Sequence, residues 1–263
     1  MTIECLQSVH SFVHDNRMLA ERAFYCLGQW NVRMVRILLQ KSTENKAEKM
    51  AQITEKVDVC VIGAGHAGCE AALACARMGL ETVIFTVSVE SIALMPCNPA
   101  VGGPAKSCLV REIDALGGVM GIVTDATYIQ MKTLNSSRGP AVRALRAQSD
   151  KKEYMTFMRH LIESNQNISL KQAMATELIV ENDTVKGVKD EFGLEYLAPA
   201  VILTTGTSLE GKCYVGLQYV NAGRMGERAA TGLSASLLKN GLELKRLKTG
   251  TPARVDSRTI DYS

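Results

Sequence analysis

The chain has 263 residues, a formal net charge of +3 and only 5% aromatic residues. This length allows one large domain or two small ones, and no apolar run is long enough to span a bilayer. The small positive charge neither requires nor opposes a nucleic-acid partner, and few aromatic side chains are available to stack on single-stranded bases.

Eight cysteines without a CxxC pair or a repeating spacing argue against a disulfide scaffold. We expect Cys60, Cys69 and Cys75 to be buried, reduced thiols, because they lie in an apolar strand and in the helix that follows it. Of the four histidines, His10 and His14 have a helical ligand spacing, but we expect no metal site.

The first 55 residues differ in composition from the rest of the chain. They could be a targeting peptide, a small accessory helix pair, or sequence upstream of a natural start at Met50. Glu4 and Asp15 argue against a targeting peptide, because such peptides are poor in acidic residues. We favour the upstream interpretation and place the folded domain at residues 56–263.

A Gly-x-Gly-x-x-Gly fingerprint stands between a predicted strand at 57–62 and a predicted helix at 67–78. Gly63 permits the tight turn, Gly65 lets the backbone approach a pyrophosphate, and Gly68 lets the helix pack closely on the strand. Free N–H groups at the helix start would face the phosphates. The predicted dinucleotide site therefore consists of Gly63, Ala64, Gly65, His66, Ala67 and Gly68.

The pattern from residue 56 onward is α/β and predicts a Rossmann-like domain, with a parallel sheet, helices on both faces and an antiparallel β-meander. A strand at 200–204 ends in a turn at Gly206, which would approach the same pyrophosphate. This order is typical of flavoproteins that bind two dinucleotides. The other predicted elements are a strand at 81–87, helices at 108–116, 149–164 and 227–239, and a three-stranded meander at 177–181, 185–190 and 193–197 beside the main sheet.

One part of the fingerprint is incomplete. The second strand of such a unit normally ends in an acidic residue that binds the ribose, but here it ends at Phe85-Thr86-Val87-Ser88. Glu90 after a bend, a hydroxyl group or the backbone could make this contact.

The loop at 95–107 places Cys97 between two prolines and before a pair of glycines. Lys106 and the helix that follows could lower the pKa of this thiol and make it reactive. The alternative is a structural loop cysteine with rigid neighbours.

Two further stretches are basic. Arg138, Arg143 and Arg146 lie within nine positions, and Arg143 and Arg146 would share a helix face. They could bind phosphate, from a flavin or from an RNA backbone, or form a solvated helix end. Residues 247–254 form a basic loop bent by glycine and proline.

These stretches together resemble the MnmG (GidA) family of tRNA uridine 5-carboxymethylaminomethyl modification enzymes. The resemblance runs from about residue 57 to residue 263 and excludes residues 1–55. It is carried by the runs 63–72, 97–103, 112–118, 138–148, 204–207, 223–226 and 241–254.

The resemblance implies an FAD enzyme that modifies the wobble uridine of tRNA together with the GTPase MnmE, in the cytoplasm, or in an organelle if the extension is a targeting peptide. Methylenetetrahydrofolate would give the one-carbon unit, NADH would reduce the flavin, and the full-length family is homodimeric. Gly63 to Gly68 would hold the FAD pyrophosphate, and the Met174 backbone would touch the adenine end. Cys97 would be a catalytic nucleophile toward the 6-carbon of uracil.

The chain departs from the family in several ways. It is shorter and lacks the NADH-contacting segment, a second cysteine, a later flavin motif and the C-terminal tRNA-binding region. Ala230 stands where the family has a serine. A truncated chain that needs the missing half is therefore one hypothesis. An inactive FAD-binding remnant and a general FAD/NAD oxidoreductase are the alternatives.

Overall fold

A computed structural model describes residues 54–224, 226–248 and 255–262. The expectations for residues 1–53 and for most of the basic loop at 247–254 lie outside the described residues. Within these ranges, no helix is both long and apolar enough to cross a membrane.

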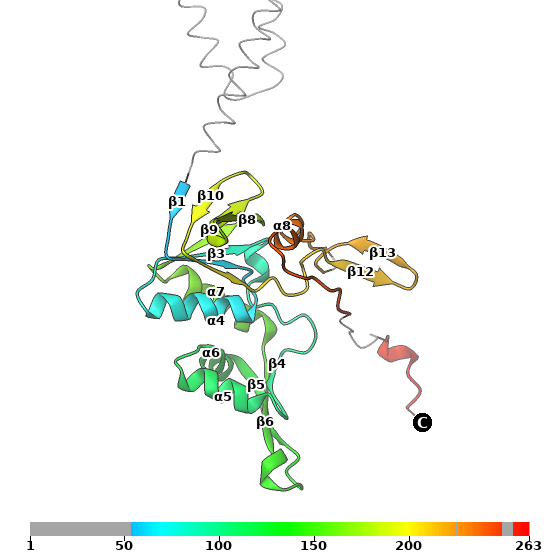
Figure 1. The fold of residues 1–263 in the computed structure, drawn as a ribbon. Helices are drawn as coiled ribbons and strands as arrows, with labels where there is room; N and C mark the ends of the chain where they lie inside the picture. The colour runs from blue at the N-terminus through cyan, green and yellow to red at the C-terminus, as the bar shows by residue number, and fades with distance from the viewer. Residues whose placement is uncertain (1–53, 225, 249–254, 263) are drawn as a thin grey trace, which may run out of the picture. The chain divides into compact units, whose positions relative to one another are not determined.

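The central sheet is parallel and has the strand order β11-β2-β3-β7 (Figure 1). Its strands are β11 (Ala200–Leu203), β2 (Val59–Ile62), β3 (Thr82–Thr86) and β7 (Ile168–Gln172). Helix α4 (His66–Arg77) connects β2 to β3 and confirms the predicted βαβ unit. β7 was not predicted, because its sequence, Ile-Ser-Leu-Lys-Gln, shows no apolar run.

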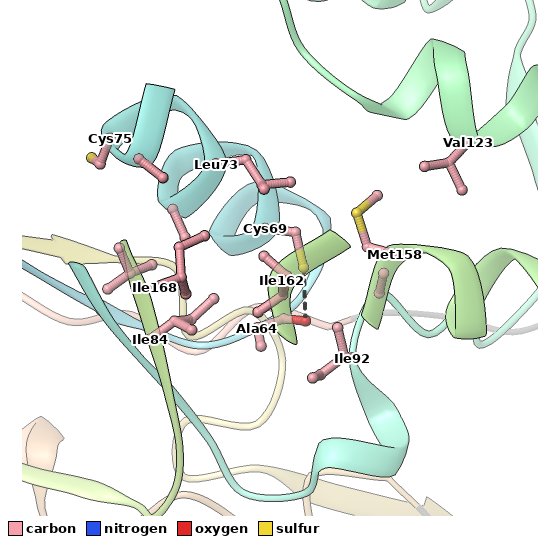
Figure 2. Packing of buried hydrophobic residues seen from close by; sticks show 14 of the residues in the cluster. Ala64, Cys69, Leu73, Cys75, Ile84, Ile92, Val123, Met158, Ile162 and Ile168 are labelled. Carbon is pink, nitrogen blue, oxygen red and sulfur yellow. Dashed lines mark hydrogen bonds between the residues drawn. The ribbon is translucent and has the colours of Figure 1, made fainter. Parts of the chain in front are cut away.

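Helices α4 and α7 (Lys151–Glu163) cover one face of this sheet. Alternate strand residues such as Val61 and Ile84 point toward them, as a period of two requires. Figure 2 shows how the apolar side chains of both helices meet over the strands. Burial of this cluster positions the start of α4 at the end of β2.

The other face is covered mainly by the predicted meander, made of β8 (Ala175–Glu181), β9 (Thr184–Asp190) and β10 (Glu195–Leu197). Phe85 of the central sheet meets Tyr196 of the meander edge-on, with 4.9 Å between ring centroids. The meander therefore stacks on the main sheet, and its predicted position beside that sheet was wrong. The physical reason is that both sheets present apolar side chains, which are buried by face-to-face packing.

Two more elements complete this second layer. Strand β1 (Thr54–Lys56) adds to the meander in parallel with β10. Helix α8 (Leu233–Lys239) packs on β8 of the meander and buries Leu233 and Leu237 in the same cluster.

A third sheet has the order β4-β6-β5 and was not predicted. It consists of β4 (Ala100–Gly102), β6 (Ala144–Ser149) and β5 (Tyr128–Leu134), and it adjoins α5 (Ser107–Ala115) and α6 (Met120–Thr127). The prediction that Arg143 and Arg146 share a helix face was wrong. Arg146 lies in β6, because residues 144–149 pair with both neighbouring strands.

The predicted helix at 227–239 begins only at residue 233. Gly226 and Gly232 adopt left-handed backbone angles, with φ of +83° and +92°, which interrupt a right-handed helix. Between them, Ala230 bonds to the loop at 208–210. The remaining elements are short: η1 (Val89–Ser91), η2 (Pro140–Val142), β12 (Lys212–Val215), β13 (Gln218–Asn221) and η3 (Ser257–Thr259).

Candidate functional site

The glycines of the fingerprint have three different spatial roles. Gly63 has φ of +106°, and a Cβ atom there would overlap the carbonyl of Thr204. A Cβ atom on Gly68 would overlap the carbonyl of Gly63, so this glycine permits the close contact between helix and strand. At Gly65, by contrast, a Cβ atom would meet no atom of another described residue within 4 Å. The backbone at Gly65 is therefore open on the side where a ligand could approach.

The N-terminus of α4 offers free hydrogen-bond donors. The first hydrogen bond of the helix runs from the N–H of Cys69 to the carbonyl of Gly65, at 2.9 Å. The three helical N–H groups before it therefore have no partner within the helix. No side chain in the described part of the chain caps this end, and the first turn holds no acidic residue. An anion such as a diphosphate would find aligned donors here and no competing carboxylate.

His66 and Ala67 occupy this first turn, and Ala64 lies just before it. The His66 ring lies 5.7 Å from the Tyr154 ring of α7, centroid to centroid. Burial, and then the positive charge of Arg224, lower the pKa of His66. The imidazole is therefore neutral near pH 7 and adds no charge at the helix end.

The turn after β11 meets the same loop. The N–H of Thr204 donates to the carbonyl of Ile62 at 2.9 Å, and its hydroxyl donates to the carbonyl of Gly63 at 2.9 Å. Two residues later, Gly206 has φ of +57° and open space beside it. These bonds fasten the end of β11 to the fingerprint, and the approach of the Gly206 turn to a pyrophosphate stays a prediction.

The Cys97 loop is anchored at both ends. Before it, the N–H of Ala93 donates to the carbonyl of Ala64 at 2.9 Å. Beyond Cys97 but within the loop, the carbonyl of Pro99 accepts from the N–H of Ser149 at 2.7 Å, and β4 pairs with β6. Cys97 itself is exposed. The loop therefore presents a thiol to solvent while one end is bonded directly to the fingerprint.

The arginine stretch lies on the adjoining hairpin. Arg146 is half-buried and pairs in register with Gly102 of β4. Arg143 is exposed, and its side chain donates to the carbonyl of Arg138 at 3.1 Å. The structure thus places Arg146 next to the Cys97 loop, whereas Arg138 and Arg143 lie at the tip of the β5–β6 hairpin.

Met174 follows β7, and both of its backbone groups are engaged. Its N–H donates to the Glu191 carboxylate at 3.2 Å, and its carbonyl accepts from the Glu191 N–H at 2.8 Å. An adenine bonded to this N–H would have to displace Glu191. The adenine contact of Met174 stays a prediction.

The end of β3 gives the candidate ribose contacts. The Thr86 hydroxyl donates to the carbonyl of Ser88 at 2.9 Å. Glu90 lies in η1 and pairs with Arg159 of α7 at 2.9 Å, on the wall of a pocket of about 310 Å³. Glu90, a hydroxyl group and the backbone all stay open as ribose ligands.

The other cysteines divide as expected. Cys60, Cys69 and Cys75 are buried and free, and burial raises the pKa of Cys60 and of Cys69 to about 12. Figure 2 shows the Cys69 thiol directed at the Ala64 carbonyl, to which it donates at 3.5 Å. These thiols are packing groups, because a protonated, buried sulfur is a poor nucleophile.

No role was predicted for Glu70 or Arg224, although both lie in runs that carry the family resemblance. The Glu70 carboxylate accepts the N–H of Met120 at 2.7 Å and that of Val119 at 3.0 Å, so it caps α6 from α4. A charged residue within an alanine-rich helix is the signal that could have identified it. Arg224 stands in a Gly-Arg-x-Gly run, which marks a turn but not its target.

The sequence profile of the family described as Glucose inhibited division protein A matches residues 58–263. Two relatives, from Synechocystis sp. and Thermodesulfovibrio yellowstonii, are each named tRNA uridine 5-carboxymethylaminomethyl modification enzyme MnmG. The first is 53% identical over 80% of this chain and 33% of its own length, and the second is 55% identical over 78% and 33%.

Among solved structures, Aquifex aeolicus GidA matches with a TM-score of 0.76 and 50% identity, over 80% of this chain and 35% of that one. This chain therefore spans about a third of the length of the relatives it matches. The match supports the Rossmann-like fold of a FAD-binding domain, and the fold and family together support a flavin cofactor. The chain belongs to the Glucose inhibited division protein A (GidA) family.

Proposed function

We propose that the chain is the FAD-binding part of an enzyme that adds a 5-carboxymethylaminomethyl or 5-aminomethyl group to the wobble uridine of tRNA. The names of its relatives support the reaction. One observation carries the proposal: the Ala93 N–H bonds to the Ala64 carbonyl, which joins the Cys97 loop to the dinucleotide fingerprint. A redox cofactor and a nucleophile would then act in one site.

FAD fits the fingerprint. Its diphosphate would lie at the N-terminus of α4, held by the backbone of residues 63–68 and flanked by the Gly206 turn. Bound there, the flavin supplies redox chemistry. For the adenine end, Ala173 is an alternative to Met174. Ala173 is 7% exposed, and its carbonyl accepts no hydrogen bond from another described residue, so it is available to the adenine amino group.

Cys97 would act as nucleophile toward uracil. Its thiolate would form a C–S bond at C6, and the C5=C6 electron pair would move toward C5 and O4. C5 could then attack the methylene carbon of methylenetetrahydrofolate, and the electron pair of a C–N bond of that carbon would pass to the folate nitrogen. Loss of the C5 proton and cleavage of the C–S bond would restore the thiolate. The exposed position of Cys97 supports access of a base to this sulfur.

The arginines provide charge for a polyanionic substrate. Arg146 beside the Cys97 loop suits a phosphate of tRNA or of the flavin, and Arg138 and Arg143 at the hairpin tip suit the tRNA backbone. Methylenetetrahydrofolate, NADH, an MnmE-type GTPase and a second copy of the enzyme are the partners that the family resemblance adds, with action in the cytoplasm.

The test has two steps. The purified chain should carry or bind FAD, seen as flavin absorbance and quenched flavin fluorescence. The remaining two-thirds of a relative, supplied separately, should then restore uridine modification in tRNA lacking it. A chain that binds FAD but never supports modification would be the inactive remnant. A chain that binds no FAD would refute the proposal.

A further inference from the structure

The segment at 223–231 is attached to the dinucleotide loop through an intermediate loop. The Ala230 N–H donates to the carbonyl of Ser208 at 2.8 Å, and the Glu210 N–H donates to the carbonyl of Ala230 at 2.8 Å. The loop at 208–210 directly follows the turn that Thr204 fixes on Gly63. Residues far apart in sequence are thus assembled around the fingerprint.

Within this segment, Arg224 is held in one orientation. The Glu227 N–H donates to the carbonyl of Arg224 at 3.0 Å, and the Arg224 Nε donates to the Glu227 carboxylate at 2.7 Å. The Arg224 side chain is 31% exposed. No hydrogen bond or ion pair among the described residues engages the terminal nitrogens of its guanidinium group. They remain available to an acceptor.

Arg224 lies close to the loop that follows the Thr204 turn, because a Cβ atom on its neighbour Gly223 would come within 2.8 Å of the Ser208 hydroxyl oxygen. Its charge also reaches the start of α4: burial first, and then the positive charge of Arg224, lower the pKa of His66, the first residue of that helix. A helix N-terminus supplies only about half a positive charge, whereas a dinucleotide diphosphate carries two negative charges. The fingerprint at 63–68 contains no lysine or arginine to supply the rest.

We propose that Arg224 binds the dinucleotide diphosphate, donating from its terminal guanidinium nitrogens to the phosphate oxygens opposite the mouth of α4. Glu227 orients the guanidinium group for this contact. Arginine suits the role better than lysine, because its planar fork can bond two phosphate oxygens at once. The inference rests on the proposed function, since it assumes that a dinucleotide occupies the fingerprint.

The experiment measures binding of FAD, ADP and riboflavin to the 263-residue chain by calorimetry. ADP carries the diphosphate without the flavin, and riboflavin carries the flavin without phosphate. Arg224→Ala should weaken FAD and ADP about 10- to 100-fold and leave riboflavin unchanged. Arg224→Lys should lose less affinity for FAD and ADP than Arg224→Ala, because lysine keeps the positive charge. Arg258→Ala removes a charge whose side chain is 87% exposed and should change nothing.

Arg224→Gln keeps the length of the side chain and replaces the alanine variant if that variant does not fold. Nuclear magnetic resonance adds a readout that needs no ligand: the pKa of His66 should rise in Arg224→Gln, because a nearby positive charge is lost. If Arg224→Ala binds FAD and ADP as tightly as the unaltered chain, or loses equal affinity for riboflavin, the inference about Arg224 is wrong while the proposed function stands. If the unaltered chain binds none of the three ligands, the proposed function fails with it.

Discussion

Glu70 joins the dinucleotide helix to the helix pair that follows the Cys97 loop. Its carboxylate accepts the N–H groups of Val119 and Met120 at the start of α6, at 3.0 and 2.7 Å. Gly118 lies against the same carboxylate, and a Cβ atom there would come within 2.8 Å of it. Replacing Glu70 by alanine would leave two partly buried donors without an acceptor.

The size of the effect follows from these bonds. A hydrogen bond to a charged group contributes about 1.5–3 kcal/mol, and loss of a helix N-cap costs about 0.5–2 kcal/mol. Because the two N–H groups share one carboxylate, we expect Glu70→Ala to lower the free energy of unfolding by about 3 kcal/mol. Glu70→Gln keeps one acceptor oxygen and should cost about 1 kcal/mol.

Urea unfolding followed by circular dichroism measures this difference. Glu163→Ala is the matched control, because Glu163 is 48% exposed and its pair with Arg159 is long, at 3.7 Å. Its cost should stay below about 0.5 kcal/mol. If Glu70→Ala costs no more than Glu163→Ala, the carboxylate does not fasten α6 to α4 and the reasoning fails.

Three further predictions concern the site and its thiols. Gly68→Ala should destabilise the fold by about 2 kcal/mol or more because its Cβ atom would overlap backbone, whereas Gly65→Ala should leave stability unchanged and weaken FAD binding. Cys97→Ser should abolish uridine modification in the complemented enzyme and leave FAD binding and stability unchanged, as measured by activity and calorimetry. Burial raises the pKa of the Cys60 and Cys69 thiols from 9.0 to about 12. Their contribution to the free energy of unfolding should therefore be fully present below pH 9 and be lost as the pH rises toward 12.

Each of these has its own control. Gly139 also has open space beside it, so Gly139→Ala should change neither stability nor FAD binding. Cys108 is exposed like Cys97, and Cys108→Ser should keep activity. Equal FAD affinity in Gly65→Ala and Gly139→Ala would refute the open approach at the fingerprint. A flat stability profile between pH 9 and 12 would contradict buried, protonated thiols.

The sequence predicted those elements whose pattern is local. The strand before Gly63, helix α4 and the Thr-Gly-Thr turn could be placed because period, glycine position and turn chemistry agree there. The hairpin turn between β8 and β9 could also be placed, since Asn182 and Asp183 both adopt positive φ, at 50° and 57°.

The predictions that failed concern elements whose structure depends on long-range pairing. β6 contains Ala144-Leu145-Arg146-Ala147, which has good helix propensity, and it is a strand only because β4 and β5 bind it on both sides. The late start of α8 has a similar cause, because bonds from Ala230 to a distant loop compete with helical ones. The contact between Glu70 and α6 spans about 50 positions, so the local pattern can mark Glu70 as unusual but cannot identify its partner.

Hydrogen bonds connect the parts of the candidate site to one another, although these parts are distant in sequence. The fingerprint is bonded to the Cys97 loop through Ala93, to α6 through Glu70, and to the 204–231 region through Thr204. A shift of α4 would therefore move the donors at 63–68 and the anchor of the Cys97 loop together. In the proposed function, this shared frame would hold the Cys97 thiol in position relative to the dinucleotide.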